Sequence, residues 1–393
     1  MKRKFLIVGS FAFMQLVASA QRKDSVAEKI SKNEIELVYN HYIQDGNHSA
    51  VTGGTGTEKL TVYGPSLRYN RAFGKNAIGF TAGTDVVSSA SVDKIDFVSS
   101  ASRVDNRSYL NANYQRSWHD WTLVLGGAAS IESDYFSLGG KAGVLKENKE
   151  KLTDYSLVFQ LYRDDLRWGR LNADEGYKPV RLIYPEELRN RDWFDTYKRN
   201  SYNLKAAVNF AVDQRNRVGV AGELSLQEGL LATPFHRVYF NNDSVTVEQL
   251  PSQRWKGGLA LKWNRFASGR IILKNTINLY KDSWNIESIS FENETVVKLD
   301  KKFSLIPGLR FYIQNGSPYF ERYKQQVPGA RYYTSDFDLS AFNSFNAGIG
   351  FRYSPYAPVW KQWLFSSVLF KYSYYNRNDG LSAHILTASF RFE

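Results

Sequence analysis

Apolar and polar residues alternate along the chain from Asn33 to its end, in about sixteen segments. Each segment is near the ~10 residues that cross a bilayer as a tilted strand. In 202–212 and 382–392 almost every even position is apolar, while polar residues such as Lys205 and Arg391 occupy odd positions. A period of two puts the apolar side chains on one face of a β-strand. The pattern predicts an all-β protein, but strands alone fit a soluble sandwich equally well.

The connections between these segments separate the two folds. Starting from a periplasmic N-terminus, nearly every second connection is tight and those between are mostly long. Outer-membrane barrels have short periplasmic turns and long outer loops, whereas a sandwich has no reason to keep that order. We therefore predict a transmembrane, antiparallel, up-and-down β-barrel of about sixteen strands. The tight connections are 72–76, 118–120, 146–151, 213–216, 265–269 and 299–302, and the long ones are 44–58, 87–106, 169–199, 229–254 and 315–341.

Three places depart from this order. The connection at 132–134 should be an outer loop but is tight, and the connection at 354–361 should be an inner turn but carries two prolines. Pro65 falls inside the second segment, which predicts a bulge or a misplaced boundary there. The strand number could accordingly be fourteen or eighteen.

The first residues have the pattern of an export signal. Lys2, Arg3 and Lys4 precede an apolar run and a small-x-small site that ends at Ala20. We predict a signal peptide at 1–20, a periplasmic tail at 21–32, and an outer-membrane barrel at 33–393. The chain has no cysteine, so disulfides and thiolate metal sites are excluded.

The composition agrees with a barrel whose lumen is basic. Mean hydropathy is −0.43, as expected where only alternate side chains face lipid, and the 15% of aromatic residues suit girdles at the membrane interfaces. The formal net charge is +12. Export argues against nucleic acid as the partner, so the charge indicates a lumen or surface that favours anions, such as lipopolysaccharide or phosphate-bearing solutes. The candidate lumen residues are Lys205, Lys256, Lys262, Lys274 and Arg310.

A doubled Val-Ser-Ser-Ala-Ser unit at 87–91 and 98–102 is bracketed by acids. Carboxylates and hydroxyls are the hard oxygen ligands that Ca²⁺ prefers, but the spacing matches no defined ion loop. The simpler interpretation is a hairpin packed by small residues, with turns capped by Asp side chains. No other cofactor is expected. The bracketing acids are Asp85, Asp93, Asp96 and Asp105.

The chain resembles the bacterial outer-membrane proteins grouped as domain of unknown function 3570. The resemblance rests on the doubled serine unit, on the Gly-rich stretch 44–58, on Arg-Phe-Tyr-Ile-Gln at 310–314, and on 333–342. It implies a β-barrel of the outer membrane. The family has no settled activity, so the resemblance supplies no catalytic residues.

The five histidines do not form a recognised catalytic or metal motif: His41, His48, His119, His236 and His384 lack both H-E-x-x-H and G-x-S-x-G contexts. A lipid-acting enzyme would need a His, a Ser and an acid to converge at the rim. The mixed-charge loop 169–199 could bind a sugar or a peptide, although such loops more often form a solvated lid.

We predict a non-enzymatic pore or conduit for small solutes, with anions as the favoured class, in the outer membrane. The alternatives are a non-conducting scaffold for an envelope assembly system and a lipid-acting barrel enzyme. The expected partners are outer-membrane lipid, lipopolysaccharide, the barrel-assembly machinery during insertion, and an unidentified periplasmic protein.

Overall fold

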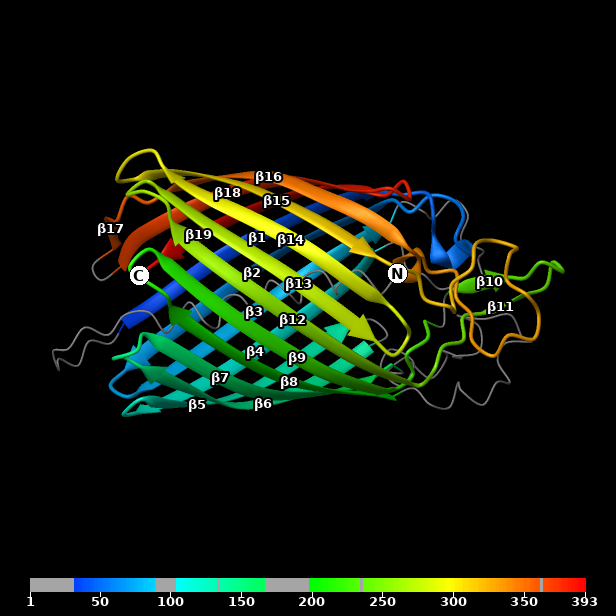
Figure 1. The fold of residues 1–393 in the computed structure, drawn as a ribbon, viewed down its shortest axis with the longest axis horizontal. Coiled ribbons are helices and arrows are strands. Elements are labelled where there is room, and N and C mark those ends of the chain that lie inside the picture. Colours follow the sequence, from blue (N-terminus) through cyan, green and yellow to red (C-terminus); the bar gives the residue numbers. More distant parts are fainter. Residues whose placement is uncertain (1–31, 90–103, 133–134, 167–197, 234–235, 361–362) are drawn as a thin grey trace.

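The computed structural model describes residues 32–89, 104–132, 135–166, 198–233, 236–360 and 363–393. It is a closed ring of sixteen antiparallel strands (Figure 1). The ring strands are β1 (Lys32–Asp45), β2 (Leu60–Phe73), β3 (Asn76–Ser89), β4 (Val104–Trp118), β5 (Trp121–Glu132), β6 (Tyr135–Asn148), β7 (Thr153–Asp165), β8 (Lys198–Ala211), β9 (Asn216–Gly229), β12 (Gln253–Phe266), β13 (Ile271–Asp282), β14 (Glu287–Lys298), β15 (Phe303–Gln314), β16 (Phe342–Tyr353), β18 (Trp363–Arg377) and β19 (Ser382–Phe392).

The ring closes because β1 pairs with β2 on one side and with β19 on the other, where Ile35 lies opposite Phe392. Three short strands lie outside the ring. β17 (Ala357–Trp360) pairs with β18 while β16 also pairs with β18 directly, and β10 (Arg237–Tyr239) forms a separate hairpin with β11 (Val245–Val247). The predicted fold and strand number are therefore confirmed.

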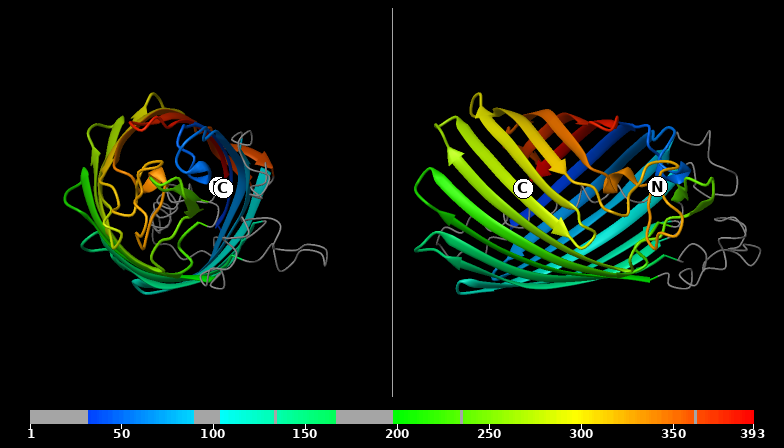
Figure 2. Two further views of the ribbon diagram at one scale, coloured as in Figure 1. Left: turned by 90° about the vertical axis from the view of Figure 1, so that its right-hand side faces the viewer. Right: turned by 45° about the vertical axis from the view of Figure 1, so that its right-hand side comes forward.

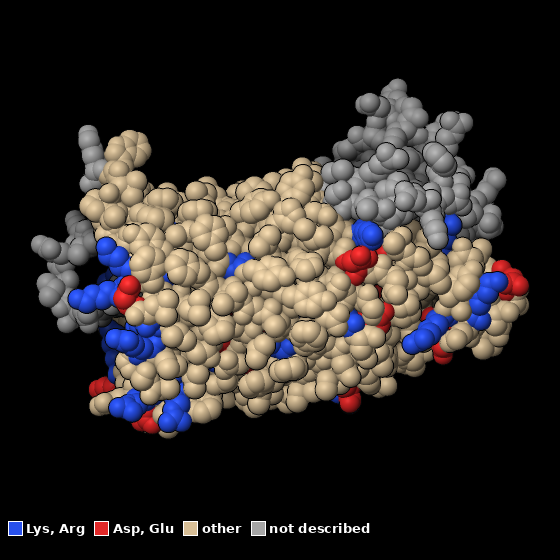
Figure 3. Space-filling view, turned by 90° about the horizontal axis from the view of Figure 1, so that it is seen from above, with Lys and Arg blue, Asp and Glu red and all other residues tan. Residues whose placement is uncertain are grey.

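The alternation in the sequence becomes two faces of the barrel wall. On β12 the side chains of Leu259, Leu261 and Trp263 are exposed on the outer surface, and the residues between them face inward. Figure 3 shows few charged atoms across the middle of one side of the barrel, with Lys and Arg gathered at one end. An apolar outer band with charges confined to its ends is the surface that a bilayer requires.

Connections of two kinds lie at opposite ends of the barrel (Figure 1). We call the end with the long connections the loop end and the other the turn end. The predicted alternation of tight and long connections is confirmed, although 283–286 and 378–381 are also short connections at the loop end. At the turn end, 354–362 is extended because it contains β17.

Pro65 lies within β2, and the expected bulge or misplaced boundary is wrong. Tyr63 pairs with Val86 and Ser66 with Gly83, so β2 and β3 keep one register on both sides of the proline. Pairing with β3 is interrupted across 64–65 without an inserted residue. Proline has no N–H to donate, and an interrupted ladder accommodates that loss.

Helical structure is minor. The 3₁₀ turns η2 (Ala50–Thr52) and η7 (Phe337–Leu339) lie in loop-end connections. Within the described part of the chain, no helix has the length and apolar character needed to cross a membrane. The predicted signal peptide and periplasmic tail at 1–31 fall outside the described residues.

Candidate functional site

The inward face of the ring carries the predicted basic residues. The strand registers place Lys205, Lys256, Lys262, Lys274 and Arg310 on the face opposite the exposed apolar side chains of β8, β12, β13 and β15. Because side chains alternate between the two faces of a strand, the position of each residue in the sequence is enough to place it on this face.

Several of these bases form ion pairs with acids on the adjacent strand. The Lys205 Nζ lies 3.3 Å from Glu223 Oε1, and the Lys274 Nζ lies 2.8 Å from Glu294 Oε1. The Arg310 Nε lies 3.0 Å from Glu292 Oε1. Opposite charges on facing positions of neighbouring strands stabilise the pairing of those strands. The wall is therefore a surface of paired charges and not a continuous row of bases.

Bases nevertheless outnumber acids on one side of the lumen. We consider inward positions at least three residues from a strand end. From β19 through β5, the charged residues at these positions are Glu36, Arg68, Asp85 and Arg107, so two acids balance two bases. From β6 to β18 seven bases face three acids, and we call this set the charged sector. Its members are Lys141, Lys205, Glu223, Lys256, Lys262, Lys274, Glu292, Glu294, Arg310 and Lys371.

Glycines let one lysine of the charged sector reach across the wall. The Lys371 Nζ on β18 lies 3.6 Å from Glu294 Oε2 on β14, and β15 and β16 separate the two strands. Between them, Gly308 pairs with both Glu294 and Gly348, and Gly350 pairs with Lys371. Because these positions have no side chain, the lysine can cross them to the carboxylate.

Three loop-end connections fold together over the mouth of the barrel (Figure 2). We call their described residues, within 46–59, 230–252 and 315–341, the cap. The cap has its own apolar core at the junction with β13 and β14, where Trp284 and Ile286 pack with it. A second small core joins the β10–β11 hairpin to the third segment. The members of the first core are Leu230, Leu231, Ala232, Leu250, Trp284, Ile286 and Leu339, and those of the second are Val238, Phe240 and Tyr333.

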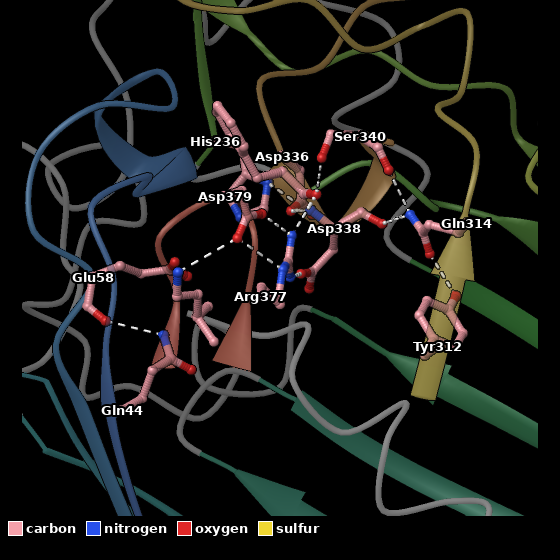
Figure 4. Close-up of polar contacts among 12 residues, drawn as sticks. Gln44, Glu58, His236, Tyr312, Gln314, Asp336, Asp338, Ser340, Arg377 and Asp379 are labelled. Atoms are coloured by element: carbon pink, nitrogen blue, oxygen red, sulfur yellow. Dashed lines mark hydrogen bonds and ion pairs between the residues drawn. The ribbon is translucent and has the colours of Figure 1, made fainter. Parts of the chain in front are cut away.

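Arg377, near the end of β18, attaches the cap to the wall (Figure 4). Its guanidinium donates to Asp338 Oδ1 at 2.6 Å and to the carbonyl oxygen of Phe337 at 2.9 Å, and it also pairs with Asp379. The guanidinium carbon lies 3.7 Å from the ring centroid of Phe342. A buried charge is stable only with such partners, so the arginine holds η7 in one position.

Arg254 and Asp282 form a second buried ion pair where the cap meets the wall. The Arg254 Nε donates to Asp282 Oδ2 at 2.8 Å, and the Asp282 side chain is fully buried. The other carboxylate oxygen accepts from the backbone N–H groups of Trp284 and Ile286 at 2.9 and 3.0 Å. One aspartate thus orders both the tight 283–286 connection and the adjacent arginine.

The interior of the cap contains a cluster that the sequence did not predict. His236 Nδ1 lies 3.2 Å from Glu248 Oε2 and 3.9 Å from Asp336 Oδ2. All three residues are buried, and Thr334 donates its hydroxyl to Glu248. His236 and Asp336 are 100 positions apart in loops without periodicity. No sequence signal could have brought them together.

The other histidines are dispersed. His41 and His384 lie on the outer face among tyrosines, and His119 lies in a turn. His48 lies in the cap, where its ring stacks on Phe337 at 3.8 Å between centroids. In the described part of the chain, the structure brings no Ser, His and acid together at the membrane-facing rim.

The acids around the doubled serine unit fall partly outside the described residues. Asp85 lies on the inward face of β3 opposite Arg107, and Asp105 lies in β4 opposite Val87. Asp93 and Asp96 are outside the described residues, as is most of the loop 169–199. The predicted ion-organised loop therefore stays a prediction.

Solved structures match most of this chain at low sequence identity. A bacterial polysaccharide outer membrane secretin matches with a TM-score of 0.47 and 11% identity over 92% of this chain and 98% of that one. The outer membrane protein opdK of Pseudomonas aeruginosa matches at 0.42 and 8% over 92% and 98%. A BenF-like porin of Pseudomonas fluorescens Pf-5 matches at 0.42 and 8% over 93% and 99%.

No curated protein matches the chain. One protein-family model does, "Protein of unknown function (DUF3570)", over residues 97–385. That range covers most of the ring, from the end of the β3–β4 connection into β19. The chain therefore belongs to the DUF3570 family, as the doubled serine unit and the segments around residues 310 and 333 indicated.

Proposed function

We propose that this protein is an outer-membrane pore that admits small solutes, prefers anions, and has a mouth narrowed by the cap. The observation that carries the proposal is the charged sector, with seven bases and three acids on the inward face of a closed sixteen-strand ring. Rings of about this size leave an aqueous interior unless loops fill them. A lumen with excess positive charge attracts anions and repels cations.

The apolar outer band supports a location in the outer membrane. A barrel pairs its backbone groups around the ring, so lipid meets only apolar side chains. Insertion would require the barrel-assembly machinery, and the basic residues gathered at one end of the barrel would contact lipid headgroups, including lipopolysaccharide. A periplasmic protein partner is a further proposal. No surface of the described residues identifies which protein it would be.

Single-channel recording in planar lipid bilayers tests the pore. The purified protein, reconstituted under a tenfold KCl gradient, is expected to give discrete current steps. Its reversal potential should have the sign of the chloride equilibrium potential. A reversal potential on the potassium side would contradict the anion preference while leaving the pore intact.

A plugged scaffold is a second candidate, favoured by one observation: the cap has two apolar cores and is attached to the wall by the buried guanidinium of Arg377, as a rigid closure would be. Recording with the Arg377→Met variant separates the two candidates. If the wild type and this variant are both silent although both are folded in the bilayer, the scaffold is preferred and the pore is rejected.

A further inference from the structure

The buried cluster inside the cap has the composition of a metal site. His236 and Glu248 come from the connection before β12, and Asp336 comes from the connection before β16. Each offers one ligand atom, and the three atoms lie within 4.8 Å of one another. We propose that His236, Glu248 and Asp336 bind a divalent transition-metal ion, of which Zn²⁺ is the type, and that the ion joins two loops of the cap.

The distances suit a small ion. A tetrahedral Zn²⁺ with ligands at about 2.0–2.1 Å holds those ligands about 3.3 Å apart. The His236 Nδ1 to Glu248 Oε2 distance is already 3.2 Å, and the distance from Nδ1 to Asp336 Oδ2 is 3.9 Å. The third distance, between the two carboxylate oxygens, is at most 4.8 Å, so a movement of about 1.5 Å by one carboxylate would place all three atoms around a common centre.

The chemistry of the ligands selects the class of ion. Ca²⁺ and Mg²⁺ take oxygen ligands, and an imidazole nitrogen facing two carboxylates suits Zn²⁺ and its neighbours. A divalent ion would also neutralise both carboxylates, which are expensive to bury as anions. Glu248 is fully buried, and His236 is 5% exposed.

Surrounding donors orient the carboxylates in the way that supports a metal. Glu248 Oε1 accepts from the backbone N–H of Thr233 at 2.6 Å, and Glu248 Oε2 accepts from the Thr334 hydroxyl. Asp336 Oδ1 accepts from the N–H of Asp338 at 3.0 Å, which leaves Oδ2 toward the imidazole. Hydrogen bonds of this kind fix metal-binding carboxylates, and their loss weakens binding about 10–100-fold.

Metal titration of the full-length, tag-free protein in detergent tests the site. After chelation and removal of the chelator, isothermal titration with ZnCl₂ is expected to show one tight site per chain. Co²⁺ is expected to give visible d–d absorption with the same stoichiometry. Glu248→Gln keeps the size of the side chain and should abolish both signals, and Thr334→Val should weaken Zn²⁺ binding about 10–100-fold.

The matched control is His384→Gln, which removes a histidine from the outer face and should leave zinc binding unchanged. Limited proteolysis of the cap shows whether each variant keeps its fold. The proposal is overturned if the wild type binds no Zn²⁺, or if a folded Glu248→Gln protein binds Zn²⁺ as tightly as the wild type. Neither result depends on whether the barrel conducts.

Discussion

Lys371 and Glu294 meet across two intervening strands, with 3.6 Å between Nζ and Oε2. Glu294 also accepts from Lys274 Nζ at 2.8 Å, so one carboxylate lies between two lysines. The lumen wall is therefore not a set of independent pairs. At Glu294 two lysines share one acid, so this group of three residues carries one excess positive charge.

That arrangement predicts the effect of removing one lysine. Lys371→Met should lower the anion-to-cation permeability ratio by up to about fivefold, because one unit charge at about 8 Å in water stabilises an anion by roughly 0.5 kcal/mol and destabilises a cation by the same amount. Reversal potentials in planar bilayers measure the ratio. The matched control is Lys146→Met, since Lys146 lies on the outer face over Trp121 and should not affect permeation. Equal ratios in wild type and Lys371→Met would contradict the role of the charged sector.

Gly308 and Gly348, which lie between Lys371 and Glu294, are expected to differ in their tolerance of an added methyl group. A Cβ on Gly348 would lie 2.7 Å from Ser373 Cβ and 2.8 Å from the Tyr372 carbonyl oxygen. A Cβ on Gly308 would meet nothing closer than 3.6 Å. Gly348→Ala should therefore destabilise the barrel by about 1–3 kcal/mol, whereas Gly308→Ala should be nearly neutral. Urea-induced unfolding from lipid vesicles compares the two, and equal stabilities would show that the wall relaxes freely.

The pair of Arg254 and Asp282 predicts a large loss of stability at the junction of cap and wall. Asp282→Ala should cost about 3 kcal/mol, because it leaves a buried guanidinium and two backbone N–H groups without their acceptor. The same unfolding assay measures the change. The control is Glu287→Gln, because the Lys281–Glu287 pair is exposed at 71% and 54% and should contribute little to stability. A similar effect of both variants would contradict the importance of burial.

Arg377 predicts a link between the cap and conductance. In Arg377→Met, η7 loses its attachment to β18, so proteases should cleave within 315–341 faster and the mean current should rise. Arg322→Met is the control, because Arg322 is an exposed residue of the same cap segment. Unchanged proteolysis in Arg377→Met would show that the apolar cores alone hold the cap.

The turn after β14 predicts a pH effect. Backbone N–H groups of Lys302 and Phe303 donate to Asp300 Oδ1 and hold the pKa of this carboxyl below its usual range. A lowered pKa in the folded state means that the carboxylate stabilises the turn above the ordinary Asp pKa of about 3.9. That contribution is lost as pH falls through the lowered pKa. NMR titration of Asp300 should show the shift, and a normal midpoint would contradict it.

The strands could be predicted because the pattern of apolar and polar residues in each strand reflects what lies on its own two faces. On β13 the alternation of Ile277 and Leu279 with Asn278 and Thr276 records lipid on one side and water on the other, and no distant contact is needed. The prediction of a bulge or a misplaced boundary at Pro65 was wrong. Two strands can omit a residue pair from their hydrogen-bond ladder without changing register, and a sequence pattern does not reveal this.

The cap could not be predicted for the opposite reason. His236, Glu248 and Asp336 meet only because two loops fold on each other, and the side chains of a loop follow no period. In the sequence, nothing distinguishes Arg377 from other polar residues near the end of a strand. Its partners, Asp338 and the Phe337 carbonyl, belong to a connection whose course is set by packing between distant segments.

The seam between β1 and β19 sets a condition on how this molecule is made. Asn40 accepts from the Thr387 hydroxyl at 2.9 Å across 347 positions of sequence. The first strand therefore has no partner on one side until the eleven residues of β19 are in place, and before that both edges of the sheet carry unsatisfied backbone groups. A chain cut before Ser382 would keep fourteen of the sixteen strand pairings, yet it would be an open sheet with two unpaired edges.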